Sequence, residues 1–366
     1  MRGEVVCYFI YDLGARVNLD RVKRVLDEVP QFPATSVQKA APRYVELPRP
    51  LVARFLPQEL ETTIGPLKVE AVARIYDLGA VSLQLRIPFQ EQGLPDLHKY
   101  LNFQVAHGGE KLSLHDFAAR FVHPIREGLR GALVEPYNVK IEPEEYTVIA
   151  ITEAEYTPKE LLRDHRARLA ALLSNEPRAD KLSPKEVEDN LRHWYSYYED
   201  DLVVVDWDYA FIYDKEGKYE DVLFVMELAN VQLLELRTYD VYLDRILDRT
   251  YQEMEKFVSR SELLASPKQL VKELSDARID LTRVTDSIEN IGKLFGDYYL
   301  AKVYVALTER FHIPEWEHAV NQKLKTLNEL YAMAAHEVEA RRMIILEFLI
   351  VLLFVVDLAF IAVTLK

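Results

Sequence analysis

The first part of the chain alternates between the apolar patterns of strands and of helices. Residues 5–11, 67–76 and 80–87 form apolar runs typical of strands, whereas residues 18–29 repeat apolar positions every three or four residues, as an amphipathic helix does. Further segments follow the same two patterns, with strands expected at 148–152, 202–205 and 209–213 and helices at 158–173 and 184–198. Prolines and Gly108-Gly109 interrupt residues 91–145, where we expect loops and short helices. Residues 1–218 are therefore predicted to form an α+β domain.

A short sequence recurs at the ends of the predicted strands. The hexapeptide Ile10-Tyr11-Asp12-Leu13-Gly14-Ala15 is repeated at residues 75–80, and its Ile-Tyr-Asp core recurs at residues 212–214. Turn chemistry explains the repeat simply, because Asp bonds to its own backbone and Gly adopts positive φ. A duplicated subdomain is the alternative, although the similarity ends with the hexapeptide.

Beyond Gly217 the pattern is helical throughout. The stretch from residue 270 to 298 has apolar residues spaced alternately by four and three, which is the seam of a coiled coil. The seam consists of Leu270, Leu274, Ala277, Leu281, Val284, Ile288, Ile291, Phe295 and Tyr298. A second helical pattern begins after Pro314 and contains no Pro or Gly up to Lys366. The sequence thus predicts an antiparallel coiled-coil stalk over residues 219–342.

Residues 343–365 form an apolar run that indicates a transmembrane helix. A helix of this length would extend roughly 34 Å, enough to cross a hydrocarbon core of about 30 Å; a buried core helix is the alternative. Arg341 and Arg342 precede the run, which predicts a single-pass protein of the inner membrane with its N-terminal bulk in the cytoplasm and the bilayer as a partner. Glu347 and Asp357 are the acids inside the run. Asp357 is expected either to hydrogen-bond a neighbouring helix or to reach the far interface as a neutral side chain.

Composition narrows the classes of function. The net charge of −14 and a pI near 5.2 give no direct signal for nucleic-acid binding. No phosphate-binding loop, dinucleotide fingerprint, zinc-protease helix, paired-cysteine motif or nucleophile elbow occurs in the sequence. His107, His115 and His123 are evenly spaced, but eight residues apart they match no common metal-ligand pattern. We therefore name no catalytic, cofactor-binding or metal-binding residue and expect no cofactor.

An acidic and aromatic segment offers one candidate groove. Trp194, Tyr198, Asp206, Trp207 and Asp208 lie around a predicted helix end and strand turn. Such residues could bind a cation or a basic peptide, because carboxylates supply charge and aromatic faces attract cations. The alternative is a solvated helix end whose aromatic rings pack on the sheet.

The C-terminal pattern resembles a known family. Residues 346–350, with Asp357 ten positions after Glu347, resemble the C-terminal anchor of the required-for-meiotic-nuclear-division family, a domain of unknown function. Residues 324–330 are similar to its coiled coil, residues 230–237 to an early helix and residues 75–81 to a strand and turn. The chain departs from the family at Phe348, where the family has Trp, and at Asp357, where it has Glu. The resemblance implies a non-enzymatic, membrane-anchored scaffold and transfers no catalytic residue.

Together these observations predict a non-enzymatic, membrane-tethered scaffold or assembly factor that forms a homo-oligomer or binds a protein partner. The alternative is a membrane-anchored enzyme or small-ligand sensor whose site lies in the α+β domain. A deep polar pocket with convergent acids or histidines would favour the alternative, whereas a flat surface would favour the scaffold.

Overall fold

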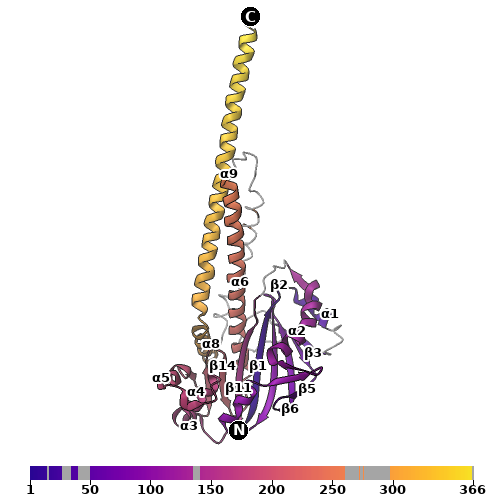
Figure 1. The fold of residues 1–366 in the computed structure, drawn as a ribbon, viewed down its shortest axis with the longest axis vertical. Coiled ribbons are helices and arrows are strands. Elements are labelled where there is room, and N and C mark those ends of the chain that lie inside the picture. Colours follow the sequence, from indigo (N-terminus) through magenta and orange to yellow (C-terminus); the bar gives the residue numbers. More distant parts are fainter. Residues whose placement is uncertain are drawn as a thin grey trace. The chain divides into compact units, whose positions relative to one another are not determined.

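The computed structural model describes residues 1–14, 16–26, 34–39, 50–134, 141–259, 272, 275 and 297–364 (Figure 1). The chain divides into two compact units. The first comprises Met1–Thr238 and Ser287–Trp316, and the second comprises Tyr239–Asp286 and Glu317–Lys366. The first unit contains a large mixed sheet with its helices, and the described residues of the second unit are helical.

The sheet of the first unit contains twelve strands within the described residues. In spatial order its main path is β12 (His193–Tyr195), β13 (Asp201–Val205), β14 (Tyr209–Asp214), β11 (Glu144–Glu153), β1 (Arg2–Asp12), β7 (Ala80–Gln90), β6 (Gly65–Ile75), β5 (Gln58–Thr62), β8 (Gln104–His107) and β9 (Glu110–Ser113). Beside β6 lies β4 (Leu51–Phe55), which pairs in turn with β3 (Ala34–Lys39), and a separate ribbon joins β2 (Arg16–Val17) to β10 (Leu133–Val134). The pairing of β11 with β14 is parallel and the other pairings are antiparallel.

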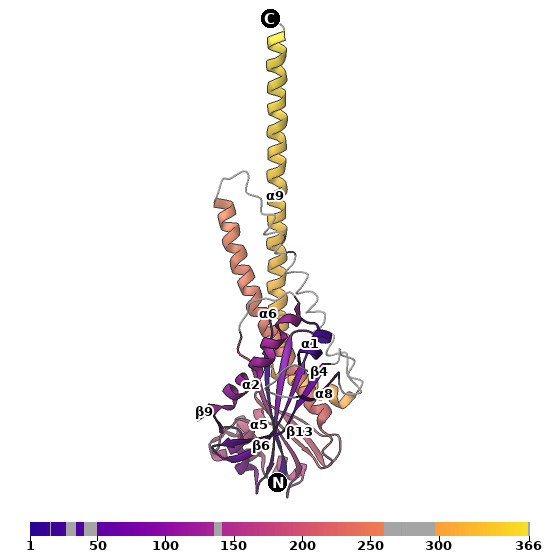
Figure 2. The same cartoon turned by 90° about the vertical axis from the view of Figure 1, so that its right-hand side faces the viewer.

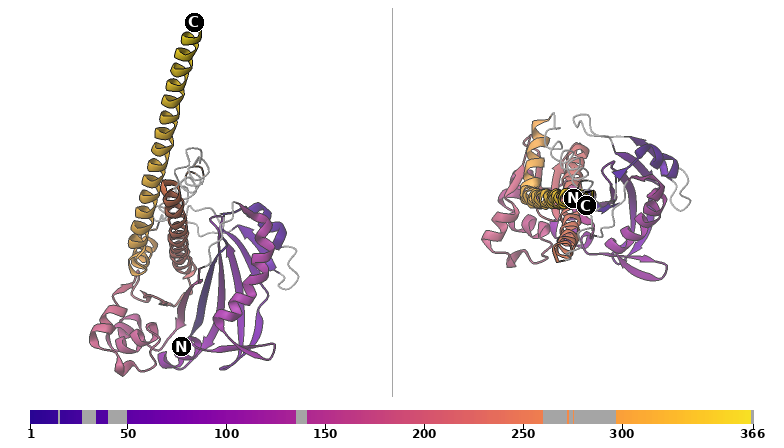
Figure 3. Two further views of the ribbon diagram at one scale, coloured as in Figure 1. Left: turned by 45° about the horizontal axis from the view of Figure 1, so that its top comes forward. Right: turned by 90° about the horizontal axis from the view of Figure 1, so that it is seen from above.

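Both faces of the central strands are buried. On β1, Val5, Cys7 and Phe9 belong to a hydrophobic core that also contains Phe117 and Phe121 of α2 (Leu114–Leu129), which lies along one face of the sheet (Figure 3). The alternate residue Tyr8 faces the opposite side, where its hydroxyl donates to the Leu223 carbonyl of α6 (Glu220–Ser259) at 3.1 Å. A strand covered on both faces needs apolar residues at consecutive positions, and residues 5–10 supply them.

Side-chain caps start the shorter helices. Ser113 accepts from the Asp116 amide at the start of α2. Thr157 and Glu160 form a capping box at the start of α3 (Pro158–Arg163), with proline at the first helical position. The remaining short helices are α1 (Leu19–Leu26), η1 (Leu94–Tyr100), η2 (Arg130–Ala132), α4 (Arg166–Leu173), η3 (Ala179–Lys181) and α5 (Pro184–Asn190).

The remaining helices of the described residues are α6, α8 (Tyr298–Arg310) and α9 (Ile313–Thr364), with 40, 13 and 52 residues. Helix α6 begins in the first unit and ends in the second, α8 packs on β12 and β13, and α9 is one continuous helix (Figure 2). Within the second unit, the Lys323 ammonium of α9 lies 2.7 Å from an Asp240 carboxylate oxygen and 2.6 Å from one of Asp244. These ion pairs join α9 to α6.

The sequence pattern located most elements but misread several boundaries. The expected helix at 158–173 is two helices, because the chain turns at Asp164 and His165 between α3 and α4. The expected helix at 184–198 ends at Asn190, and residues 193–195 form β12 because they pair with β13. Residues 91–145 contain the β8–β9 hairpin and the 16-residue helix α2, which accommodates Pro124 in its interior.

The predicted transmembrane helix over residues 343–365 is wrong. Among the described residues, no helix combines the length and the apolar character needed to cross a membrane. The expected span ran to Leu365, one residue beyond the described end of α9. It also included Glu347 and Asp357, and an acidic side chain costs roughly 2.5–3.5 kcal/mol at the centre of a hydrocarbon layer. The C-terminal membrane anchor and the single-pass location in the inner membrane rested on that helix and fall with it.

The predicted coiled-coil seam cannot be placed. Leu270, Leu274, Leu281, Val284, Ile288 and Ile291 all lie outside the described residues. The second arm of the expected hairpin lies within α9.

Candidate functional site

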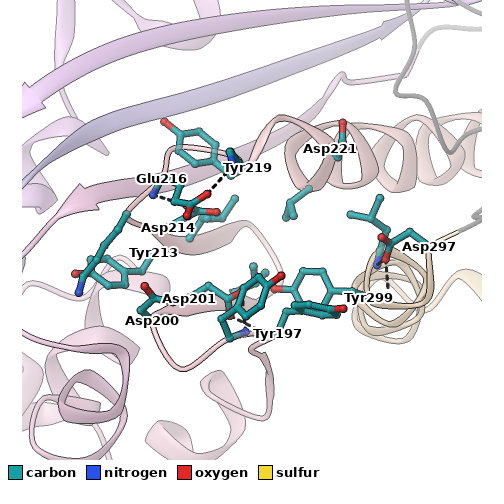
Figure 4. A pocket seen from close by; sticks show the side chains of 17 residues that line it. Tyr197, Asp200, Asp201, Tyr213, Asp214, Glu216, Tyr219, Asp221, Asp297 and Tyr299 are labelled. Carbon is teal, nitrogen blue, oxygen red and sulfur yellow. Dashed lines mark hydrogen bonds and ion pairs between the residues drawn. The ribbon is translucent and has the colours of Figure 1, made fainter.

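A pocket of about 250 Å³ opens in the first unit, where residues 197–222 meet residues 297–300. The β13–β14 hairpin, the beginning of α6 and the beginning of α8 contribute its walls (Figure 4). The lining residues are Tyr197, Tyr198, Asp200, Asp201, Val203, Ile212, Tyr213, Asp214, Lys215, Glu216, Lys218, Tyr219, Asp221, Val222, Asp297, Tyr299 and Leu300.

Strand pairing positions two of the carboxylates. Asp201 at the start of β13 is paired with Asp214 at the end of β14. The Asp201 carboxylate accepts from the amides of Tyr197 at 2.7 Å and Tyr198 at 3.1 Å. Asp214 accepts from the Glu216 amide at 2.8 Å. These backbone donors fix the carboxylates where the hairpin enters the pocket.

A helix cap positions a third carboxylate. Asp297 is the N-cap of α8, and its Oδ1 accepts from the amides of Tyr299 at 2.7 Å and Leu300 at 3.2 Å. This contact satisfies backbone donors that have no partner within a helix, and it holds negative charge at the end of the helix that attracts it. The same cap fixes the backbone from which Tyr299 reaches the pocket.

Tyrosine rings line the pocket beside the acids. The Tyr197 ring lies edge-on to Tyr198, with centroids 4.7 Å apart, and edge-on to Tyr299, with centroids 5.7 Å apart. Burial, together with the nearby Asp201, Asp214 and Asp297, raises the pKa of Tyr299. Tyr299 therefore stays protonated in the ordinary pH range and is no base.

Carboxylates outnumber the lysines of the lining. Lys218 pairs with Glu216 at 2.6 Å. Asp221 carries a raised pKa because its carboxyl is partly desolvated and lies near Glu220 and Asp297. A cation entering the pocket would relieve this repulsion, so the electrostatics favour a positively charged ligand.

The candidate groove predicted from the sequence is divided between the two ends of β13. Tyr198 lines the pocket at the start of the strand, whereas Asp206, Trp207 and Asp208 form the turn after its end. Trp194 lies on β12 and its side chain is exposed.

The Asp206 turn holds the junction between α8 and α9. Asp206 accepts from Arg310 Nε at 2.7 Å, and the Trp207 ring lies 5.4 Å from that of His312. Phe311 is buried edge-on to Tyr146, with centroids 5.5 Å apart. These contacts give the turn a structural role.

The evenly spaced histidines do not converge. His107 lies on β8 against the Phe117 ring, His115 Nδ1 lies 2.5 Å from Glu145 Oε1, and His123 is exposed on α2. Over the part of the chain that the structure describes, no group of His, Cys, Asp and Glu side chains could hold a metal ion.

The acids of the C-terminal run lie on the surface of α9. Glu347 and Asp357 are both exposed. Arg341 and Arg342 also belong to α9, and their side chains are outside the described set.

Sequence reasoning missed most of the pocket. Asp297 and Tyr299 lie more than seventy positions after Asp221, so that only the fold brings them beside Asp214 and Asp221. One signal was present, because Asp214 ends the third copy of the Ile-Tyr-Asp repeat.

Comparisons with known proteins agree over the N-terminal part of the chain. Residues 2–220 match a family described as the N-terminal domain of the uncharacterized protein MJ0711. The uncharacterized protein MJ0711 of Methanocaldococcus jannaschii is 27% identical over 225 residues, which cover 62% of this chain and 68% of that relative. No solved structure matches the chain.

The matched region runs from β1 to the start of α6 and includes the hairpin side of the pocket, whereas Asp297 and Tyr299 lie outside it. These matches do not show the resemblance to the required-for-meiotic-nuclear-division family. Since the family match spans more than half of the sequence, the chain belongs to the family of the uncharacterized protein MJ0711, through that family's N-terminal domain.

Proposed function

We propose that this chain is a non-enzymatic binding protein, a scaffold whose pocket recognises a cationic side chain on a basic segment of a partner protein. The observation that carries the proposal is the convergence of fixed carboxylates and tyrosine rings in one cavity of about 250 Å³. A cavity of this size can hold the end of a lysine or arginine side chain, but it is too small to receive the surface of a folded protein.

Electrostatics support a cation. Asp201, Asp214 and Asp297 are held in place by backbone amides before any ligand arrives. A cation 4 Å from one carboxylate gains on the order of 4 kcal/mol at an effective dielectric constant near 20, before desolvation is subtracted. Because the acids are already positioned, binding costs little additional ordering.

The tyrosine rings add a second attraction. The Tyr197 ring stands edge-on to those of both Tyr198 and Tyr299, so ring faces point in different directions around the same region. An ammonium or guanidinium over one such face gains about 0.5–1 kcal/mol at an exposed site. The ligand would thus contact carboxylates and the faces of aromatic rings, groups that suit binding more than bond cleavage.

The sequence resemblance to the required-for-meiotic-nuclear-division family supports the same class of role. That family implies a scaffold without catalytic residues, and its early helix is similar to residues 230–237. The membrane anchor of that family forms no part of the proposal.

Calorimetric titration with a lysine- and arginine-rich peptide tests the proposal. We expect the double variant Asp200→Asn/Asp221→Asn to bind at least about tenfold more weakly, a loss of about 1.4 kcal/mol, because it removes charge without touching the acids that hold the backbone. Glu188→Gln on α5 is the matched control, since Glu188 is a highly exposed acid outside the pocket. Equal affinities for all three proteins would contradict the proposal.

The same titration addresses the alternative of a small-ligand sensor. Free lysine, arginine and a linear polyamine serve as probes beside the peptide. Binding of a small amine as tight as that of the peptide would favour the sensor, because the peptide backbone would then contribute nothing.

We also propose that α9 takes part in self-association. From Met343 to Val356 its large apolar side chains are exposed, and contiguous apolar surface marks interaction sites. Leu352→Lys should lower the weight-average mass in sedimentation equilibrium, whereas Met333→Lys, at an exposed apolar position earlier on α9, should not. A wild-type chain that stays monomeric over the accessible concentration range would contradict this expectation.

A further inference from the structure

A second polar cluster lies between α6 and the sheet, away from the pocket. Glu235 of α6 is fully buried, and neither of its carboxylate oxygens has a hydrogen-bond partner among the described residues. Thr238, also fully buried, has a hydroxyl without a partner in the same set. Most buried polar groups in proteins have a hydrogen-bond partner, so a buried carboxylate without one calls for an explanation.

Another acid on the same helix shows how α6 normally compensates a buried carboxylate. Glu227, two turns earlier, is also fully buried. It forms an ion pair with Arg74 and accepts from the Tyr76 hydroxyl at 3.0 Å. Glu235 lacks an equivalent cation within the described residues, and the charges that act on it are negative.

The repeated hexapeptides bring those negative charges together. Asp12, at the end of β1, is paired with Ala80 at the start of β7, and Asp77 lies in the turn between β6 and β7. The Leu13 amide donates to the Gly79 carbonyl at 2.8 Å, and the Val17 amide donates to the Asp77 carbonyl at 2.9 Å. These backbone contacts join the two copies of the repeat, so that Asp12 and Asp77 both act on Glu235.

An ionised Glu235 would be a desolvated charge with no counterion among the residues that the structure describes. Burial raises the pKa of Glu235 well above its usual value, and the charges of Asp12 and Asp77 raise it further. Asp12 comes from β1 and Asp77 from the β6–β7 turn, so the two charges that raise the pKa of Glu235 belong to the sheet side of the cluster. The protonated acid is the form that this environment tolerates.

We propose that Asp12, Asp77 and Glu235 form an internal proton-binding site, which holds the adjoining segment of α6 on the sheet while Glu235 carries a proton and loosens it when the proton leaves. The ligand of the site is the proton itself. The duplicated Ile-Tyr-Asp-Leu-Gly-Ala sequence supplies both aspartates, which gives the repeat a role beyond turn formation.

The direction of the effect follows from the raised pKa. In the unfolded or detached segment Glu235 ionises near its ordinary value, whereas in the packed segment it ionises at higher pH. At pH values between these two pKa values, the packed form therefore holds one more proton than the detached form. The packed form is most stable below the ordinary pKa range of glutamate, and its stability falls as pH rises toward the pKa of Glu235 in the packed segment. Over that window the equilibrium constant for opening should rise about tenfold per pH unit.

Hydrogen exchange of the full chain at several pH values tests the site. Exchange is followed in peptides covering residues 228–238 and corrected for the intrinsic effect of pH on amide exchange. We expect the wild-type opening constant to rise about tenfold per pH unit within the window, and Glu235→Gln, which is uncharged and similar in shape, to remove that rise. Glu220→Gln is the control on the same helix. Glu220 is exposed, and its ion-pair partner Arg86 would still be paired with Glu4, whose carboxylate lies 3.2 Å from the guanidinium.

A second variant separates a proton site from a merely fragile segment. Asp77→Asn removes one of the charges that favour the proton, so the pH-dependent rise should end at a lower pH while the segment stays packed. Equal pH dependence in the wild type and in Glu235→Gln would overturn the proposal, and so would an unchanged window in Asp77→Asn.

Discussion

At the scale of single residues, Asp221 connects the pocket to pH. Its carboxyl has a raised pKa because it is partly desolvated and lies near Glu220 and Asp297, and it faces a pocket whose ligand we expect to be positive. Only the ionised carboxylate attracts a cation. Affinity should therefore increase as pH rises through the Asp221 pKa and should level off above it.

Calorimetric titration of a basic peptide from about pH 4 to pH 7 measures this dependence. The increase should shrink in Asp221→Asn and persist in Glu188→Gln, because Glu188 lies on the exposed face of α5. A pH profile that is identical in the wild type and Asp221→Asn would show that another group controls the dependence.

The surroundings of a residue could be predicted from the sequence where residues next to it in the chain determine them. Residues 5–11 were expected to form an apolar strand, and Cys7 among them is buried on β1, where burial raises the pKa of its thiol to about 12. Asp206 shows the limit, because the sequence offered it as part of a groove although Arg310, more than a hundred positions away, is its partner. Partners that distant leave no local pattern.

At the scale of elements, the N-terminal cap of α8 has two separable roles. Asp297 accepts backbone amides of Tyr299 and Leu300, and its charge also faces the pocket. Asp297→Asn should keep most of the cap, since Asn is a good N-cap residue, but should weaken peptide binding. Asp297→Ala should weaken binding and also lower the free energy of unfolding by about 0.5–2 kcal/mol.

Urea denaturation and calorimetric titration of the two variants distinguish these roles. Equal losses of stability in both would mean that the charge, and not the cap, holds the helix end. Unchanged peptide binding in both would remove Asp297 from the site.

Elements with a clear period could be predicted, and elements defined by pairing could not. Strand β1 and the continuous helix α9 follow patterns that the sequence carries locally. Strand β12 has three residues and exists because His193, Trp194 and Tyr195 pair with β13, so its sequence resembled the end of a helix. Helix α2 was missed because Pro124 and Gly108-Gly109 suggested loops.

At the scale of the whole molecule, the described chain combines a mixed-sheet unit that carries the pocket with a second, helical unit. The sequence predicted an α+β domain followed by helices, but its transmembrane helix is not supported by any helix among the described residues. Length alone was a poor guide there, since a run can be long and still include acids such as Glu347 and Asp357. The pocket, built from residues 197–222 and 297–300, required the fold.

The central claim is that the pocket binds a cationic side chain, and NMR of the full chain with ring-labelled tyrosine tests it most directly. Addition of a lysine- and arginine-rich peptide should shift the ring resonances of Tyr197 and Tyr299, assigned through their Tyr→Phe variants, and leave that of Tyr156, which packs on His165 away from the pocket, unchanged. In Asp200→Asn/Asp221→Asn the same shifts should require at least about tenfold more peptide to reach half their full size. Saturating peptide that leaves Tyr197 and Tyr299 unmoved would contradict the account.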